Sequence, residues 1–128
     1  MRVFLTSAFA RFARKERIDD QRLCAAVART ELGSVDADLG GGVIKQRVAR
    51  AGGGRSGGYR TLIAYRAAYR SVFLHGFAKS DRDNIDDREL GNLKKLARYY
   101  FSFTDEQIAL ALQERELREV ACNDEDKA

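Results

Sequence analysis

The sequence predicts an α+β fold, with helices grouped at either end of a small antiparallel sheet. Two observations predict it: the middle of the chain holds three apolar, partly alternating segments joined by short turns, and both ends carry apolar residues at helical spacing. Strands joined by short turns pair antiparallel, so the middle segments are expected to form a meander. Helices segregated from such a sheet are typical of the α+β class.

The first third of the chain predicts one strand and two helices. Residues 3–5 form a continuous apolar run that is readable as a strand. Ser7 is a candidate cap for a first helix, and Asp19 or Asp20 for a second, because such side chains accept hydrogen bonds from the free amides of a helix start. Gly33 stands where the second helix is expected to end.

The middle third predicts the meander. Residues 33–42 are rich in glycine, serine and aspartate, which predicts a loop. Residues 51–58 form a glycine-rich turn. Strands are expected over residues 43–50, 59–66 and 71–79.

Alternation along these strands predicts which side chains share a face of the sheet. In the first strand, Lys45 and Arg47 project together. In the third strand the two expected faces consist of Val72, Leu74, Gly76 and Ala78, and of Phe73, His75, Phe77 and Lys79.

The last third predicts two more helices. Asp86 or Asp87 is expected to cap a helix that carries leucines at helical spacing. Thr104 and Gln107 have the spacing of a capping box, which opens a final helix that runs through Leu117.

A length of 128 residues fits one domain with its own core. We expect a single domain over residues 1–122 and a polar tail at residues 123–128. The sequence lacks an apolar run long enough to span a membrane and lacks the pattern of a secretory signal. We therefore expect a cytoplasmic protein with no membrane partner.

The net charge of +4 conceals an uneven distribution. Residues 39–80 hold eight basic residues and no acidic one, whereas residues 1–38 carry a net charge of +1 and residues 81–128 carry −5. The basic segment coincides with the expected meander, so one sheet gathers much of the positive charge. Such a surface points to a polyanionic partner.

Metal ligands are scarce. Cys24 and Cys122 match no metal-ligand spacing and no CxxC motif, and the chain has one histidine. The acid-free segment offers no carboxylates for magnesium, so we expect no metal and no other cofactor. Without an export signal, the two cysteines are expected to be reduced thiols rather than a disulfide.

The remaining reactive side chains are those of arginine, lysine, tyrosine and His75. This set suits cleavage of RNA by its own 2′-hydroxyl, in which cations stabilise the negative charge that gathers on the phosphate. A lysine with a lowered pKa, or His75, is a candidate for moving the protons.

The glycine-rich turn has two interpretations. Five glycines around Arg55 and Ser56 allow close approach of the backbone to a phosphate. The turn is not followed by a helix and lacks a GK[ST] motif, which favours a simple hairpin tip. Three other basic residues at turns are expected to be solvated charges: Arg66, Arg70 and Arg82.

Three segments together resemble a known family: GGGVIKQRVAR, GRSGGYRTLIAYR and FLHGFAKSDRDNI, the last followed by a leucine-rich helix. Over roughly residues 2–117 the chain resembles the HigB-like branch of the RelE toxins, which belong to bacterial type II toxin–antitoxin pairs. The resemblance implies two N-terminal helices packed on a small curved antiparallel sheet with C-terminal helices. It implies a metal-independent endonuclease that cuts mRNA on the ribosome. It further implies a cognate antitoxin, expected to be a helix-turn-helix DNA-binding protein.

The resemblance also implies roles for single residues. Lys45 and Arg47 match the basic pair expected to contact RNA phosphates, and Arg60 matches the arginine expected to stabilise the transition state. Lys79 matches the lysine of a GFAK motif and is expected to be catalytic together with Lys45, Arg47, Arg60 and His75. His75 stands where relatives are expected to carry an aromatic residue, so it is either a proton shuttle or a packed strand residue.

Four further residues are expected to bind RNA without reacting. Arg50 and Arg55 match a basic loop that holds mRNA or ribosomal RNA. Tyr59 and Phe77 are candidates for stacking on a base, as aromatic residues on sheet faces do.

Two other functions stay open at this point. One is a ParE-like inhibitor of DNA gyrase without nuclease activity, and the other is a nucleic-acid-binding module without catalysis. The acid-free basic sheet favours the nuclease over the gyrase inhibitor, because binding gyrase does not require a phosphate-sized positive site.

Overall fold

The structure is a computed structural model that describes residues 1–50, 58–78 and 85–122. These residues form four helices and a six-stranded sheet, which makes the domain α+β as predicted. In chain order the elements are β1 (Arg2–Thr6), α1 (Ser7–Glu16), α2 (Asp20–Glu31), β2 (Ala37–Gly40), β3 (Val43–Val48), β4 (Tyr59–Arg66), β5 (Arg70–Ala78), α3 (Asp87–Phe101), α4 (Asp105–Gln113) and β6 (Leu117–Val120). Among them, no helix has the length and apolar character needed to cross a membrane.

The sheet is mixed rather than purely antiparallel. Its strand order is β2-β3-β4-β5-β1-β6, and β1 runs parallel to β5 while every other pair is antiparallel. The expected meander β3-β4-β5 is present, but the expectation of a fully antiparallel sheet is wrong. The continuous apolar run of residues 3–5 is buried throughout, as is typical of a strand covered on both faces.

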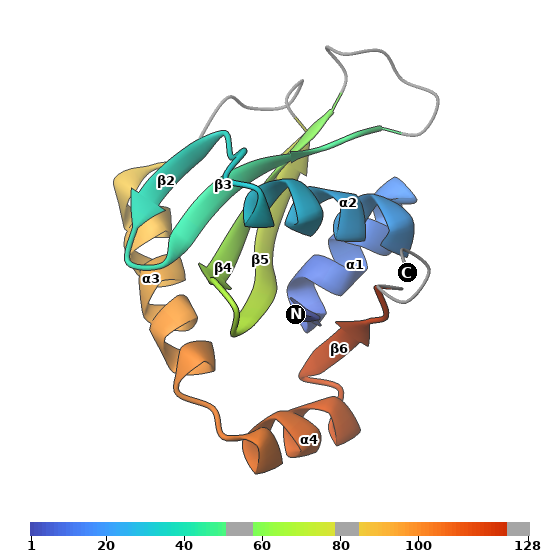
Figure 1. Ribbon diagram of the computed structural model, residues 1–128, viewed down its shortest axis with the longest axis vertical. Helices are drawn as coiled ribbons and strands as arrows, with labels where there is room; N and C mark the ends of the chain where they lie inside the picture. The colour runs from blue at the N-terminus through green and yellow to red at the C-terminus, as the bar shows by residue number, and fades with distance from the viewer. Residues whose placement is uncertain (51–57, 79–84, 123–128) are drawn as a thin grey trace.

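Helices cover both faces of the sheet (Figure 1). One apolar cluster joins α1 and α2 to the face that carries Phe73 and Ile63. The other joins α3 and α4 to the face that carries Leu62 and Val72. The sheet is therefore the middle layer of three.

Helix starts follow the expected caps closely. The side chains of Asp19, Asp86 and Thr104 cap α2, α3 and α4, and the last two form complete capping boxes. Thr6, rather than Ser7, caps α1, with its hydroxyl accepting a hydrogen bond from the Phe9 amide at 3.1 Å.

Two strands lie where the sequence predicted none. The expected loop at residues 33–42 contains β2, which pairs with β3 through a turn of three glycines with positive φ. The last helix ends at Gln113 rather than continuing through Leu117, because Arg115 adopts a left-handed conformation (φ 63°). The chain then enters β6, which pairs with β1. A glycine, the usual signal for such an ending, is absent at this position.

A disulfide joins Cys24 to Cys122, with a Cα–Cα distance of 5.6 Å. The expectation of two reduced thiols is therefore wrong. The reason is the same unexpected strand: β6 runs antiparallel to β1 and ends beside α2, where Cys24 lies.

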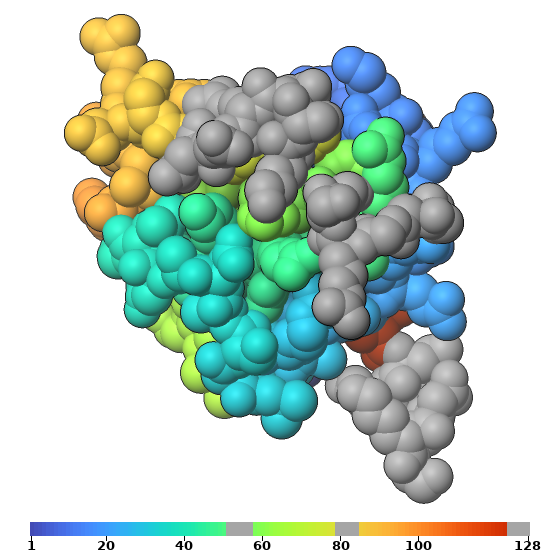
Figure 2. All heavy atoms as spheres, turned by 90° about the horizontal axis from the view of Figure 1, so that it is seen from above, coloured from blue at the N-terminus to red at the C-terminus, as the bar shows by residue number. Residues whose placement is uncertain are grey.

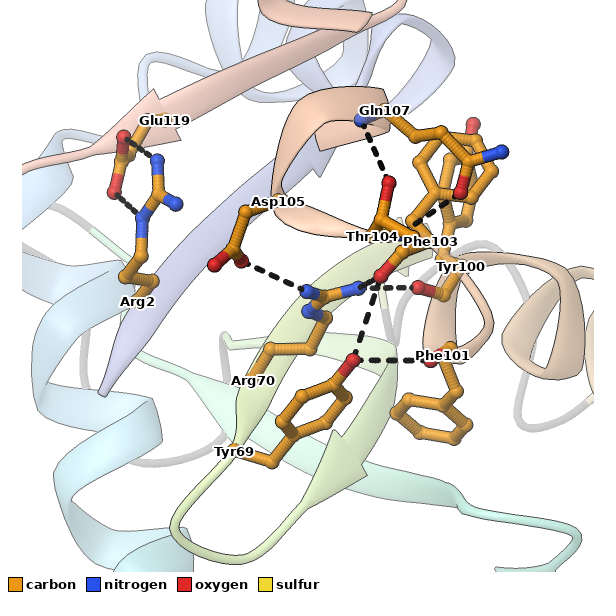
Figure 3. A network of polar contacts seen from close by, with 10 residues as sticks. All are labelled: Arg2, Tyr69, Arg70, Tyr100, Phe101, Phe103, Thr104, Asp105, Gln107 and Glu119. Carbon is orange, nitrogen blue, oxygen red and sulfur yellow. Dashed lines mark hydrogen bonds and ion pairs between the residues drawn. The ribbon is translucent and has the colours of Figure 1, made fainter. Parts of the chain in front are cut away.

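Arg70 is also not the solvated turn charge that was expected. It is 4% exposed, and its Nη1 donates to the carbonyl oxygens of Tyr100 at 2.7 Å and Phe103 at 3.0 Å. Tyr100 lies in the last turn of α3 and Phe103 comes just after the helix, so the guanidinium satisfies acceptors that the helix end leaves open (Figure 3). Nearby, Arg66 lies over the Phe101 ring at 4.5 Å from its centroid. Arg82 and the tail at residues 123–128 lie outside the described residues.

Candidate functional site

The basic pair of β3 and the arginine of β4 share one face of the sheet. Arg47 pairs directly with Arg60, and Lys45 pairs with Leu62. Because directly paired residues project to the same side, Lys45, Arg47 and Arg60 lie together on the face that α3 partly covers. The expectation that Lys45 and Arg47 share a face is confirmed.

A β-bulge brings His75 to the same face. Leu62 pairs with His75 but Ile63 pairs with Phe73, so Leu74 is an extra residue in β5. Leu74 and Phe77 both belong to the apolar cluster under α3, whereas Phe73 lies in the other cluster. The predicted alternation through residues 72–79 is therefore wrong at this point, because strict alternation cannot contain a bulge.

Gly76 supports this local geometry from the other face. A Cβ atom at this position would lie 2.5 Å from the Phe12 ring of α1. Only glycine lets α1 approach β5 so closely beneath the bulge. On the opposite side, the rings of His75 and Phe77 are 6.1 Å apart between centroids.

Arg60 is held by a carboxylate that the sequence did not single out. Its Nε lies 3.0 Å from Asp36 Oδ2, and its side chain is only 13% exposed. Nη1 is buried and makes no hydrogen bond with any part of the chain that the structure describes. A buried donor without a partner is unfavourable, so this nitrogen is suited to receive an acceptor such as a phosphate oxygen.

Asp36 was missed because its position depends on β2, which was expected to be loop. Its amide donates to the Lys45 carbonyl at 3.0 Å, so pairing with β3 brings the carboxylate toward Arg60. No periodic pattern in residues 33–42 signals that pairing.

The face gathers three cationic side chains. Like charges directly opposite each other in a sheet repel, and Arg47 is directly opposite Arg60. Asp36 forms an ion pair with Arg60. The half-buried Lys45 adds a third cation, and among the described residues no ion pair joins it to a carboxylate. Several cations gathered on one surface attract an anion.

Arg47 and Arg60 lie at the end of the molecule where β3 ends and β4 begins. Figure 2 looks onto that end, and the surface of β3 and β4 (green) lies between the β2–β3 hairpin (cyan) and α1 and α2 (blue). Residues 51–57 and 79–84 lie outside the described residues, and the sequence-predicted Arg55 and Lys79 are among them.

Tyr59 lies on the opposite face and is buried. Its hydroxyl donates to Glu16 Oε1 at 3.1 Å, and its ring meets Phe12 edge-on with centroids 5.7 Å apart. Burial and the hydrogen bond from its hydroxyl to Glu16 raise the pKa of Tyr59. The guanidinium of Arg50 lies over the Tyr59 ring, 5.9 Å from its centroid. The structure therefore does not bring these two residues to the face of Arg60.

Among the described residues, no cluster of three or more His, Cys, Asp and Glu side chains could hold a metal ion. The face brings three cationic side chains and an imidazole together. A phosphodiester placed against Arg60 would have cations and a proton-transfer group within the same three strands.

Comparison with known proteins adds one finding. A family model described as the RelE toxin of the RelE/RelB toxin–antitoxin system matches residues 1–120. No curated protein matches the chain significantly.

Proposed function

Because the chain belongs to the RelE toxin family of the RelE/RelB toxin–antitoxin system, we propose that it is a metal-independent endonuclease that cuts mRNA on the ribosome and thereby inhibits translation. Family membership carries with it a cognate antitoxin partner. We further propose that this antitoxin is a helix-turn-helix DNA-binding protein, and that the toxin acts in the cytoplasm on ribosome-bound mRNA.

One observation carries the proposal: Lys45, Arg47, Arg60 and His75 come from three neighbouring strands to one face of the sheet. In the proposed reaction, the 2′-hydroxyl oxygen of a nucleotide attacks the adjacent phosphorus. The bond from phosphorus to the 5′-oxygen then breaks, leaving a 2′,3′-cyclic phosphate and a 5′-hydroxyl. One base removes the 2′-hydroxyl proton and one acid protonates the leaving 5′-oxygen.

Arg60 is assigned to the phosphate. Its Nε is held by Asp36, which fixes the direction of the guanidinium, and its buried Nη1 has hydrogen-bonding capacity to spare. A preorganised donor of this kind stabilises the charge that develops on the phosphoryl oxygens. Asp36 is therefore a positioning residue.

Proton transfer is assigned to His75 and Lys45, which pair with Leu62 from either side, two residues along β4 from Arg60 on the same face. Imidazole is the commonest proton-transfer group in enzymes. Arg47 neutralises the flanking phosphate, and Phe77, which is 5% exposed, offers an apolar wall next to His75. We propose that Arg55 and Lys79 hold the RNA strand, whereas Arg50, which lies over Tyr59 on the opposite face, does not contact the phosphate held by Arg60.

Induced expression followed by mapping of mRNA 5′ ends tests the proposal. Wild-type protein is expected to produce new 5′ ends that follow the reading frame. The Arg60→Ala variant is expected to produce none, while Arg98→Ala, which removes an exposed arginine of α3, serves as the charge-matched control. Intact mRNA accompanied by gyrase-linked DNA breaks would refute the proposal and favour the gyrase inhibitor.

A further inference from the structure

A second basic region lies away from the candidate site. A hollow of about 560 Å³ opens between α1, the end of α4 and β6. Strand β6 is the edge of the sheet opposite β2, and β5 and β1 separate it from β4, where Arg60 lies (Figure 1). The residues that line it are Ser7, Ala10, Arg11, Arg14, Leu112, Arg115, Leu117, Arg118 and Glu119.

One wall of the hollow is a single face of α1. Ser7, Ala10, Arg11 and Arg14 are spaced by three, four and seven residues, so they stand above one another on the helix. Two arginines one turn apart thus point to the same space. The other wall consists of the turn and strand that follow α4.

Within residues 1–50, 58–78 and 85–122, most of the positive charge in the hollow lacks a counterion. Among the described residues, no carboxylate pairs with Arg11, Arg14 or Arg115. Arg118 shares its charge with Asp20 at 3.4 Å. Among the lining residues that the structure describes, the single carboxylate is already occupied.

That carboxylate belongs to Glu119, which accepts two hydrogen bonds from the Arg2 guanidinium, each 2.9 Å long (Figure 3). The hydrogen bond and the charge of Arg2 lower the pKa of Glu119, so it stays ionised and paired with Arg2. Glu119 is therefore a poor counterion for the arginines across the hollow.

Arg115 occupies a strained position. Its φ of 63° places it in the left-handed region, at the residue after the C-cap of α4. Glycine is the usual residue there because it alone adopts this conformation without strain. The chain instead places a guanidinium at the rim of the hollow.

From these observations we propose that the hollow binds a phosphorylated nucleoside, supplied either as a free nucleotide or as part of an RNA strand. The volume lies within the usual range for small-molecule sites. The half-buried Leu112 provides an apolar contact for the base or sugar, while the guanidiniums take phosphate oxygens bidentately.

An acidic peptide fits the hollow less well. Its carboxylates carry one charge each and stand on separate side chains, whereas linked phosphates present several charges within a few bond lengths. Three or four convergent guanidiniums match the closely spaced charges of linked phosphates better than the separated carboxylates of a peptide. The proposal does not rest on the proposed nuclease activity, because it involves none of the residues assigned to cleavage.

Calorimetric titration of the full chain tests the site with three probes: ADP, a 2′-O-methyl RNA hexamer that resists cleavage, and a hexaglutamate peptide. Binding of ADP identifies a free nucleotide as a sufficient ligand, and binding of the hexamer alone identifies an RNA strand. The Arg11→Gln/Arg14→Gln variant is expected to bind whichever nucleotide probe binds the wild type at least about tenfold more weakly. Arg98→Gln, an exposed arginine of α3, is the matched control and is expected to leave the affinity unchanged.

Arg115→Gly keeps the test independent of folding defects, since glycine relieves the strained φ while removing the charge. It too is expected to weaken binding by about tenfold. Three results would overturn the proposal: no binding of either nucleotide probe, tighter binding of the peptide, or a loss of nucleotide binding in Arg60→Ala but not in the hollow variants. Cleavage assays on the same variants report on the nuclease separately.

Discussion

Loss of the Cys24–Cys122 disulfide is expected to destabilise the fold substantially. The bond joins residues 98 positions apart and ties the end of β6 to α2. Closing a loop of about 100 residues in the unfolded chain is worth up to about 4.7 kcal/mol by chain entropy, and measured values are typically about 2–4 kcal/mol. For a domain of this size, each kcal/mol shifts Tm by about 3–5 °C. We therefore expect the Cys122→Ser variant to melt about 6–20 °C below the oxidised wild type.

Thermal unfolding followed by circular dichroism measures this difference. Wild-type protein kept in a phosphine reductant should have the same Tm as the variant, because both lack the disulfide. Thiol counting by mass spectrometry reports the state of each sample. If oxidised and reduced wild type melt within about 2 °C of each other, the reasoning from loop closure is wrong.

Three further perturbations follow from single contacts. Replacing Arg70 with Met removes two charge-assisted hydrogen bonds to carbonyls at the C-terminal end of α3, and urea titration should show a loss of about 3 kcal/mol in the free energy of unfolding; a loss below about 0.5 kcal/mol would contradict the capping role. Gly76→Ala places a Cβ against the Phe12 ring and should lower the free energy of unfolding by about 1–3 kcal/mol, whereas an unchanged value would mean that α1 can shift freely. Glu119→Gln should lower stability at neutral pH only: Arg2 lowers the pKa of Glu119, so its contribution is present above the unfolded pKa and is lost as the pH falls below about 4. If the difference in the free energy of unfolding between wild type and Glu119→Gln grew as the pH fell, this reasoning would be wrong.

Local signals predicted the helices and part of the sheet. The caps at Asp19, Asp86 and Thr104 are local hydrogen-bonding patterns, so they are visible in the sequence and match the structure. The alternation of Lys45 and Arg47 is local too, and it predicted the basic face correctly. The family match agrees with the resemblance to RelE toxins that the three central segments carry.

The features that were missed depend on partners distant in sequence. The bulge at Leu74 is a mismatch between two strands, and neither strand shows it alone. Strand β6 forms because β1 has an open edge, and the disulfide follows from that pairing. The ion pair between Asp36 and Arg60 likewise exists only because β2 pairs with β3. These are tertiary effects that periodicity does not encode.

The central claim is that Arg60 and its neighbours on the sheet face cleave RNA without a metal. Its most direct test is single-turnover cleavage of mRNA on programmed ribosomes by wild type and Arg60→Ala, with the product ends identified. We expect 2′,3′-cyclic phosphate and 5′-hydroxyl ends, and a rate that falls by about 100-fold or more in the variant, as for loss of one preorganised donor. Products with 5′-phosphate ends, or a variant that cuts at the wild-type rate, would contradict the assignment.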